Sequence, residues 1–77
     1  MRRSDPVMTE DYDQQGELVA VEIFRARGGF RGSWQCPMLG LSGASFETSI
    51  DEALSAARRK AAVAIQVKKA TQNDRNA

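Results

Sequence analysis

Three arginines lie close together in the middle of the chain, within the segment RARGGFRG. Arg25, Arg27 and Arg31 surround a pair of glycines. Guanidinium groups bind carboxylates and phosphates through paired hydrogen bonds, so a turn that carries three of them could hold an acidic protein surface or a phosphate backbone. A solvated turn whose basic residues only aid solubility is the simpler interpretation, and the sequence leaves both open.

Residue types that perform catalysis are scarce. The chain of 77 residues has no histidine, the commonest general base and metal ligand, and only one cysteine. That cysteine, Cys36, alternates with apolar residues in a strand-like segment, so we expect a buried and unreactive thiol. Gly28 and Gly29 lack the spacing of a phosphate-binding loop. We therefore predict no enzyme activity, no catalytic residue, no metal site and no cofactor.

The ends of the chain limit the size of the folded domain. Residues 1–16 and 71–77 show no apolar periodicity, so we expect a flexible N-terminal arm, a single domain over residues 17–70 and a flexible C-terminal tail. A core this small is marginal in a monomer. The formal net charge of +1 does not suggest a strongly basic nucleic-acid binder. No apolar run is long enough to span a membrane, and an unpaired cysteine fits a reducing compartment, so we expect a cytoplasmic protein.

A β-hairpin is predicted from residue 18 to residue 38. The run LVAVEIFRA over residues 18–26 is rich in β-branched and aromatic types, and Gly28-Gly29 fits a two-residue turn in which both positions need positive φ. This turn makes every pair on one face apolar, and Phe24 then lies on the other, outer face. The apolar pairs are Ile23 with Trp34, Val21 with Cys36, and Val19 with Met38.

A short third strand completes the expected sheet. We predict it over residues 44–48 (ASFET), with Phe46 facing the core and Ser45 and Glu47 facing solvent. The predicted fold class is α+β: an antiparallel three-stranded sheet covered on one face by one C-terminal helix, in the order β-β-β-α.

The helix is predicted from a capping box. Ser49 and Glu52 have the spacing of an N-cap and its N3 partner, so the helix begins at Ile50 and extends to about Ala70. One apolar stripe faces the sheet: Ile50, Ala53, Leu54, Ala57, Ala61, Ala64 and Ile65.

A second apolar stripe beside the first makes the helix more apolar than one small sheet requires. It includes Ala56, Val63 and Val67, small residues that suit helix–helix contact across a two-fold axis. We therefore predict a homodimer through this stripe. The outer sheet face around Phe24 and the edge of the strand at residues 18–26 are alternative interfaces.

The order of these features resembles the HicB-like antitoxin domain over residues 18–66. In that family a strand leads through a glycine turn to an aromatic-bearing strand, a Pro-x-Leu-Pro-Gly-type segment, a short strand and a helix that opens Thr-Leu-Glu-Glu-Ala. The matching segments are Gly28-Gly29-Phe30, Pro37-Met38-Leu39-Gly40 and Ser49-Ile50-Asp51-Glu52-Ala53. The proline before Gly40 is missing, and no segment after the helix is predicted as the family's further strand or as a DNA-binding domain. The resemblance implies a dimeric protein that neutralises an RNA-cleaving toxin by direct binding.

Two classes of function follow from these observations. The leading prediction is a non-catalytic protein-binding module, an antitoxin-like inhibitor or an adaptor of a partner such as a toxin or an enzyme. It would bind through Arg25, Arg27, Arg31 and Phe24. The alternative is a small regulatory protein that binds RNA or DNA with the same arginines and a second basic cluster. That cluster is Arg58, Arg59 and Lys60.

Overall fold

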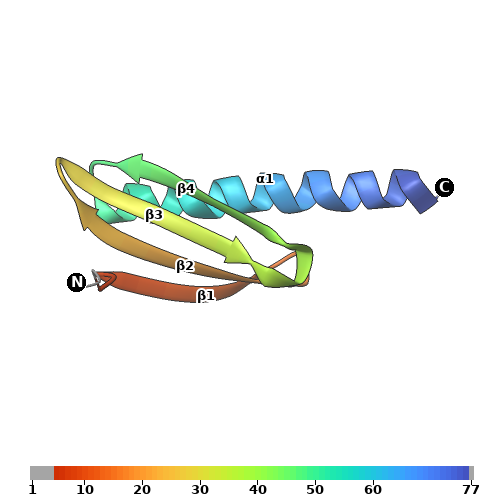
Figure 1. Cartoon of the computed structure of the whole chain (residues 1–77), viewed down its shortest axis with the longest axis horizontal. Coiled ribbons are helices and arrows are strands. Elements are labelled where there is room, and N and C mark those ends of the chain that lie inside the picture. The colour runs from red at the N-terminus through yellow and green to blue at the C-terminus, as the bar shows by residue number, and fades with distance from the viewer. Residues whose placement is uncertain (1–4, 77) are drawn as a thin grey trace.

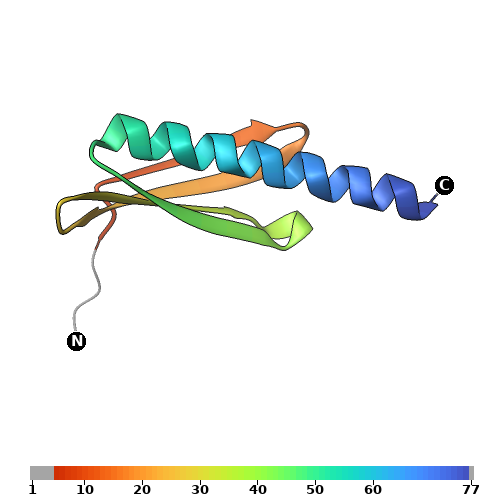
Figure 2. The same cartoon turned by 90° about the horizontal axis from the view of Figure 1, so that it is seen from above.

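The computed structural model describes the backbone of residues 5–76 and the side chains of residues 5–72. Its described part is an α+β fold, in which an antiparallel sheet in the order β1-β2-β3-β4 carries one C-terminal helix, α1, on one face (Figures 1 and 2). The predicted fold class is confirmed in this form. The number of strands is not, because the sheet has four strands and not three.

The additional strand, β1 (Met8–Gln14), lies where we predicted a flexible arm. Its side chains alternate, with Met8, Glu10, Tyr12 and Gln14 on the half-buried face and Thr9, Asp11 and Asp13 exposed. Polar residues occupy half of the inward positions, so apolar periodicity could not reveal the strand. The prediction of an arm over residues 1–16 is therefore wrong for residues 8–14, and residues 1–4 lie outside the described part.

A two-residue turn joins β1 to β2 (Glu17–Ala26). Gln15 and Gly16 have φ of 56° and 85°, the left-handed pair that a type I′ turn requires. The amide of Gly16 also donates a hydrogen bond to Oδ1 of Asp13, at 3.0 Å. The tight turn fixes the antiparallel register in which Tyr12 lies opposite Val19.

The hairpin of β2 and β3 (Gly29–Cys36) is present, but its turn is one residue earlier than predicted. Ala26 pairs with Gly29, so the turn residues are Arg27 and Gly28, and only Gly28 has positive φ, at 80°. Val21 lies opposite Trp34, and Ile23 opposite Gly32, two residues from the predicted register. A shift of two keeps each side chain on its predicted face.

Gly29 serves a purpose other than the turn. A Cβ at this position would collide with the main-chain oxygen of Glu47 and lie 3.0 Å from the ring of Phe46. Gly29 is therefore needed for the close approach of β4, which a reading of the hairpin alone cannot detect.

β4 (Leu41–Glu47) is longer than the predicted strand, and its faces are reversed. Ser45 is buried, whereas 52% of Phe46 is exposed, so Phe46 lies on the outer face. The reason is the close approach of the helix, since a Cβ on Gly32, the partner of Ser45, would lie 2.9 Å from the main-chain oxygen of Ala53. A phenylalanine side chain on this inner face of β4 would not fit beneath the helix. Met38, also predicted inward, lies in the short 3₁₀ turn η1 (Pro37–Leu39) and is 81% exposed.

α1 (Ile50–Asn76) begins at the predicted residue. The amide of Glu52 donates to Oγ of Ser49 at 3.1 Å, which satisfies one of the free helix N–H groups. The carboxylate of Glu52 accepts a hydrogen bond from the hydroxyl of Thr48 at 2.7 Å. The helix continues past the predicted end near Ala70, so residues 71–76 of the predicted flexible tail are helical.

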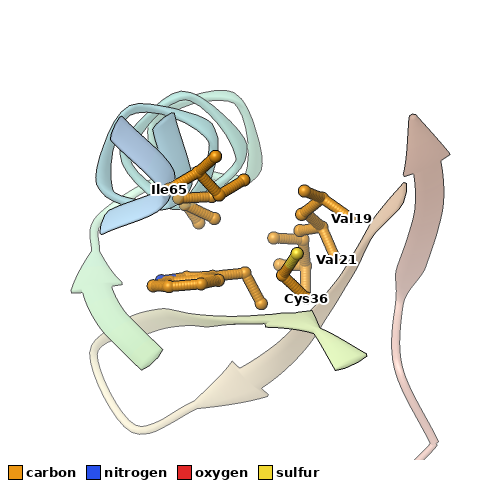
Figure 3. Close-up of a cluster of buried hydrophobic side chains, with 9 residues drawn as sticks. Val19, Val21, Cys36 and Ile65 are labelled. Carbon is orange, nitrogen blue, oxygen red and sulfur yellow. The ribbon is translucent and has the colours of Figure 1, made fainter. Parts of the chain in front are cut away.

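The core lies between α1 and the inner face of the sheet (Figure 3). Val19, Val21 and Cys36 point from the strands toward Ile65 on the helix, and all four are fully buried. Trp34 on β3 is 4% exposed and belongs to the same cluster. The predicted burial of Trp34 and Cys36 is confirmed. In the first helix stripe, Ala53, Ala57, Ala61 and Ile65 are fully buried, whereas Ile50, Leu54 and Ala64 are partly buried against the same core.

The helix is longer than the strands that it covers. Its 27 residues span about 40 Å, whereas the seven residues of β4 span about 24 Å. Its C-terminal end consequently projects beyond the sheet (Figures 1 and 2). In the described part of the chain, no helix has both the length and the apolar content needed to cross a bilayer.

Candidate binding surfaces

The three predicted binding arginines do not lie on one face. Arg31 lies on the outer face of β3, opposite Phe24, while Arg25 lies on the helix side of β2, opposite Phe30. The guanidinium of Arg25 sits over the ring of Phe30, 5.5 Å from its centroid. Arg27 is in the exposed turn. The hairpin tip therefore presents positive charge in several directions.

A row of three large side chains crosses the outer face near this tip. Phe24 lies opposite Arg31, and Arg31 lies opposite Phe46, on β2, β3 and β4 respectively. Directly opposed residues share one face with Cβ atoms about 5 Å apart. Among residues 5–76, no helix covers this face, which lies away from α1 (Figure 2). We call Phe24, Arg31 and Phe46 the aromatic row.

Phe46 is the member of the row that the sequence did not reveal. Its ring lies against Gly29 of the neighbouring strand, where the missing side chain leaves space for it. An aromatic that covers a cross-strand glycine is a known way to stabilise a sheet. The face of Phe46 follows from the β3–β4 register, which the alternation of residues 44–48 alone does not give.

The remainder of the outer face is acidic toward β1. Asp11 and Asp13 are exposed there, and Glu22 lies on β2 opposite Thr9. The outer face therefore has a basic and aromatic end at the Arg27-Gly28 turn and an acidic side along β1. These residues do not form the uniformly basic surface that is expected of a protein that binds nucleic acid without sequence preference.

Two side chains of the helix contact the hairpin of β1 and β2. The guanidinium of Arg58 forms a bidentate pair with Glu10, in which Nε donates to Oε1 at 3.0 Å. The hydrogen bonds with Glu10 raise the pKa of Arg58 further above its ordinary value. Lys69 donates to the main-chain oxygen of Gln15 at 2.6 Å and pairs with Glu17 at 3.3 Å. Arg58 is thus engaged within the chain, which weakens the predicted role of the second basic cluster.

Tyr12 lies beneath the same arginine. The guanidinium of Arg58 is 5.4 Å from the centroid of its ring. Burial raises the pKa of the Tyr12 hydroxyl above its ordinary value, Glu10 adds to the increase, and the positive charge of Arg58 opposes it. That hydroxyl is buried and has no hydrogen-bond partner among the described residues.

The predicted dimer stripe is divided by the fold. Ala56 is 1% exposed and so cannot contribute a surface, whereas Val63 and Val67 are 56% and 59% exposed. The alternative interface at strand 18–26 is also excluded, because β2 lies between β1 and β3 and has no free edge. The open edges of the sheet belong to β1 and β4.

An open depression lies at the start of the helix. It is lined by Glu47, Asp51, Glu52, Ser55 and Arg59. In the described part of the chain, no cluster of three or more histidine, cysteine, aspartate or glutamate side chains has the arrangement of a metal site. The depression has no property that distinguishes it from a solvated helix start.

No protein family, curated protein or solved structure matches the chain. The resemblance to the HicB-like antitoxin domain thus stays a prediction from the residues at 18–66. The aromatic row and the open edges of the sheet are the surfaces through which the protein could bind a partner.

Proposed function

We propose that the protein is a non-catalytic binding module that recognises another protein through the aromatic row and the arginines of the hairpin tip. The observation that carries this proposal is the position of Phe24, Arg31 and Phe46 side by side on the sheet face opposite α1. Aromatic residues and arginine are the types that dominate the binding energy of protein interfaces. An antitoxin-like inhibitor or an adaptor of an enzyme is the corresponding role.

The charge pattern supports a protein partner over a nucleic acid. A partner that matches this face would offer carboxylates to Arg27 and Arg31, an apolar pocket or ridge to the two phenylalanines, and basic residues to Asp11 and Asp13. A polyanion would gain from the first contact but would be repelled by the acidic side. The HicB-like resemblance agrees with this direction, since it implies direct binding to a toxin.

A second candidate function has one specific observation in its favour. Proteins that bind single-stranded RNA on a sheet stack two or three bases on exposed aromatics, and Phe46 joins Phe24 as the second aromatic of this face. Arg31 between them could contact the intervening phosphate. The nearby carboxylates of β1 make this candidate the weaker of the two.

One set of variants tests the binding surface. Phe24→Ser with Phe46→Ser should abolish capture of the partner from extracts of the native host, and Arg27→Ser with Arg31→Ser should weaken it at least tenfold. The matched control is Leu18→Ser, because Leu18 is an apolar residue of the same face, 58% exposed, at the opposite end of β2. Partner capture that survives the double phenylalanine variant, in a protein with an unchanged circular dichroism spectrum, would contradict the proposal.

Salt dependence separates the two candidates. Fluorescence anisotropy with a labelled single-stranded oligonucleotide should show no saturable binding by the wild-type protein if the partner is a protein. Tight binding whose logarithm falls steeply with the logarithm of salt concentration, and which is lost in the Phe24 and Phe46 variant, would favour the nucleic-acid candidate instead.

A further inference from the structure

The two open edges of the sheet differ in chemistry. β1 has three carboxylates, Glu10, Asp11 and Asp13, and charged side chains are a common device that prevents edge-to-edge pairing. β4 has the sequence LSGASFE, with no charged residue before Glu47 at its end. Only the β4 edge is therefore suited to pair with another strand.

The backbone groups of β4 that face this edge can be identified. The two-residue turn at Arg27-Gly28 makes Ala26 and Gly29 a hydrogen-bonded pair, so the alternation along β3 directs the amides of Trp34 and Gly32 toward β4. The backbone groups of Ser42, Ala44 and Phe46 consequently point away from β3. An independent observation agrees, since the ammonium of Lys60 donates to the main-chain oxygen of Ala44 from the helix side, at 3.4 Å.

The exposed valines of α1 lie on the same side of the molecule. Val63 and Val67 follow Lys60 by three and seven residues, so they share one flank of the helix with it. Arg58 and Lys69 reach the β1 end of the sheet, which makes the flank of Lys60 the β4 side. The unpaired strand edge and the two exposed valines therefore lie on the same side of the molecule.

We propose that the chain forms a two-fold homodimer through the edge of β4 and the β4 flank of α1. The surface consists of the outward backbone groups of Ser42, Ala44 and Phe46 and the side chains of Val63 and Val67. An antiparallel strand edge is complementary to its own copy, because donors and acceptors alternate along it. An axis through Ala44, the middle residue of β4, pairs the whole strand with that of the partner. This dimer does not depend on the partner-binding function proposed above.

The spacing of the elements suits this arrangement. Paired strands lie about 4.8 Å apart, and α1 packs mainly over β4 and β3. Two copies of the helix would therefore lie roughly 8–10 Å apart, the distance at which helices with small side chains pack. A standard interface buries about 800 Å² per partner, about a seventh of the 5462 Å² accessible surface of one chain. A strand edge alone is too narrow for that area, so the helix flank has to contribute.

Lys60 opposes the association in a testable way. In the single chain the ammonium of Lys60 donates to the main-chain oxygen of Ala44, so it has to move away before the strand edges pair. In the dimer the two Lys60 ammonium groups also approach the axis and repel each other. Replacement of Lys60 by Ala should therefore strengthen the dimer severalfold, and added salt should do the same to the wild-type protein.

The first test uses sedimentation over a concentration series. We expect a monomer–dimer equilibrium with a Kd no weaker than tens of micromolar. Ala44→Pro should weaken it at least tenfold without unfolding the chain, because the lost amide points to solvent and not to β3. Val63→Lys with Val67→Lys should do the same, while the control Leu18→Lys, at a residue of similar exposure, should leave the Kd unchanged. A monomeric wild-type protein at tens of micromolar would overturn the proposal.

The second test needs no substitution. The amides of Ser42, Ala44 and Phe46 should exchange with deuterium more slowly as the protein concentration rises, and those of Thr9 and Asp11 on the β1 edge should not. Exchange of the three β4 amides that is independent of concentration, in a protein shown to dimerise, would mean that the strand edge is not the interface.

Discussion

The indole of Trp34 on β3 lies over Gly43, its partner on β4. A Cβ at position 43 would be 2.7 Å from Nε1 and 2.8 Å from the adjoining ring carbon of Trp34. Phe46 and Gly29 form the corresponding pair on the outer face of the same two strands. Each ring thus occupies the space that a glycine leaves free, and this pairing sets the position of β4.

Gly43→Ala is expected to destabilise the protein by about 1–3 kcal/mol, the usual cost of an additional methyl group in a packed core. The indole is buried in the same core cluster as Ala53 and Ala57, so it has little room to move aside. Chemical denaturation measures the change. In the Trp34→Phe background the same substitution should cost clearly less, because the smaller ring leaves room for the methyl group. An equal cost in both backgrounds would show that the indole is not the obstacle.

Trp34→Ala should remove roughly 3–5 kcal/mol of the free energy of unfolding, the typical cost of truncating a buried aromatic residue. Small domains have little more than this in total, so the variant should be largely unfolded at room temperature. Circular dichroism and one-dimensional NMR would detect the loss of structure. A folded Trp34→Ala protein with nearly unchanged stability would show that Trp34 does not form the core.

The turn between β1 and β2 offers a stabilising substitution. Gln15 is held at a φ of 56°, where most side chains are strained and asparagine is better tolerated. Gln15→Asn should therefore raise the free energy of unfolding by about 0.5–1 kcal/mol. Arg27→Asn is the matched control in the other hairpin turn, where only Gly28 has positive φ, and no comparable gain is expected there. Equal effects at both positions would contradict the explanation.

The sequence predicted the elements whose signal is local. Turn residues and alternation predict the strand at residues 18–26, the hairpin, and the inward side chains of Trp34 and Cys36. A capping pattern predicts the start of the helix at Ser49. β1 escaped this reasoning because Glu10 faces inward and is neutralised by Arg58, 48 residues further along the chain. The sequence does not distinguish an inward carboxylate with an ion-pair partner from a carboxylate exposed to solvent.

The errors on β3 and β4 share one cause. Gly29 and Gly43 are small because an aromatic ring from the neighbouring strand lies against each of them. The sequence predicts a turn at Gly29 and places Gly43 just before the third strand, because a glycine by itself does not show which side chain packs against it. Alternation over residues 44–48 places Phe46 in the core, so the sequence does not predict the aromatic row. The row forms through the alignment of three strands, and short sequence motifs do not encode that alignment.

Tyr12 allows a test of the β1 contact by pH. The folded state raises the pKa of its hydroxyl above the ordinary value of 10, mainly through burial, so the folded protein retains this proton at a pH where the unfolded chain has lost it. The contribution of Tyr12 to stability is therefore fully present below about pH 10 and declines as the pH rises toward the folded-state pKa. Because Tyr12 is the only tyrosine, its ultraviolet absorbance reports this titration directly.

Tyr12→Phe provides the comparison. At neutral pH the variant should be as stable as the wild-type protein or up to about 1 kcal/mol more stable, because the buried hydroxyl that it removes has no partner among the described residues. Above pH 10 the wild-type protein should lose stability faster than the variant, since only the wild type has a phenol to ionise. If the tyrosine absorbance titrates at the pH of free tyrosine and the two proteins lose stability in parallel, β1 does not bury Tyr12 beneath Arg58.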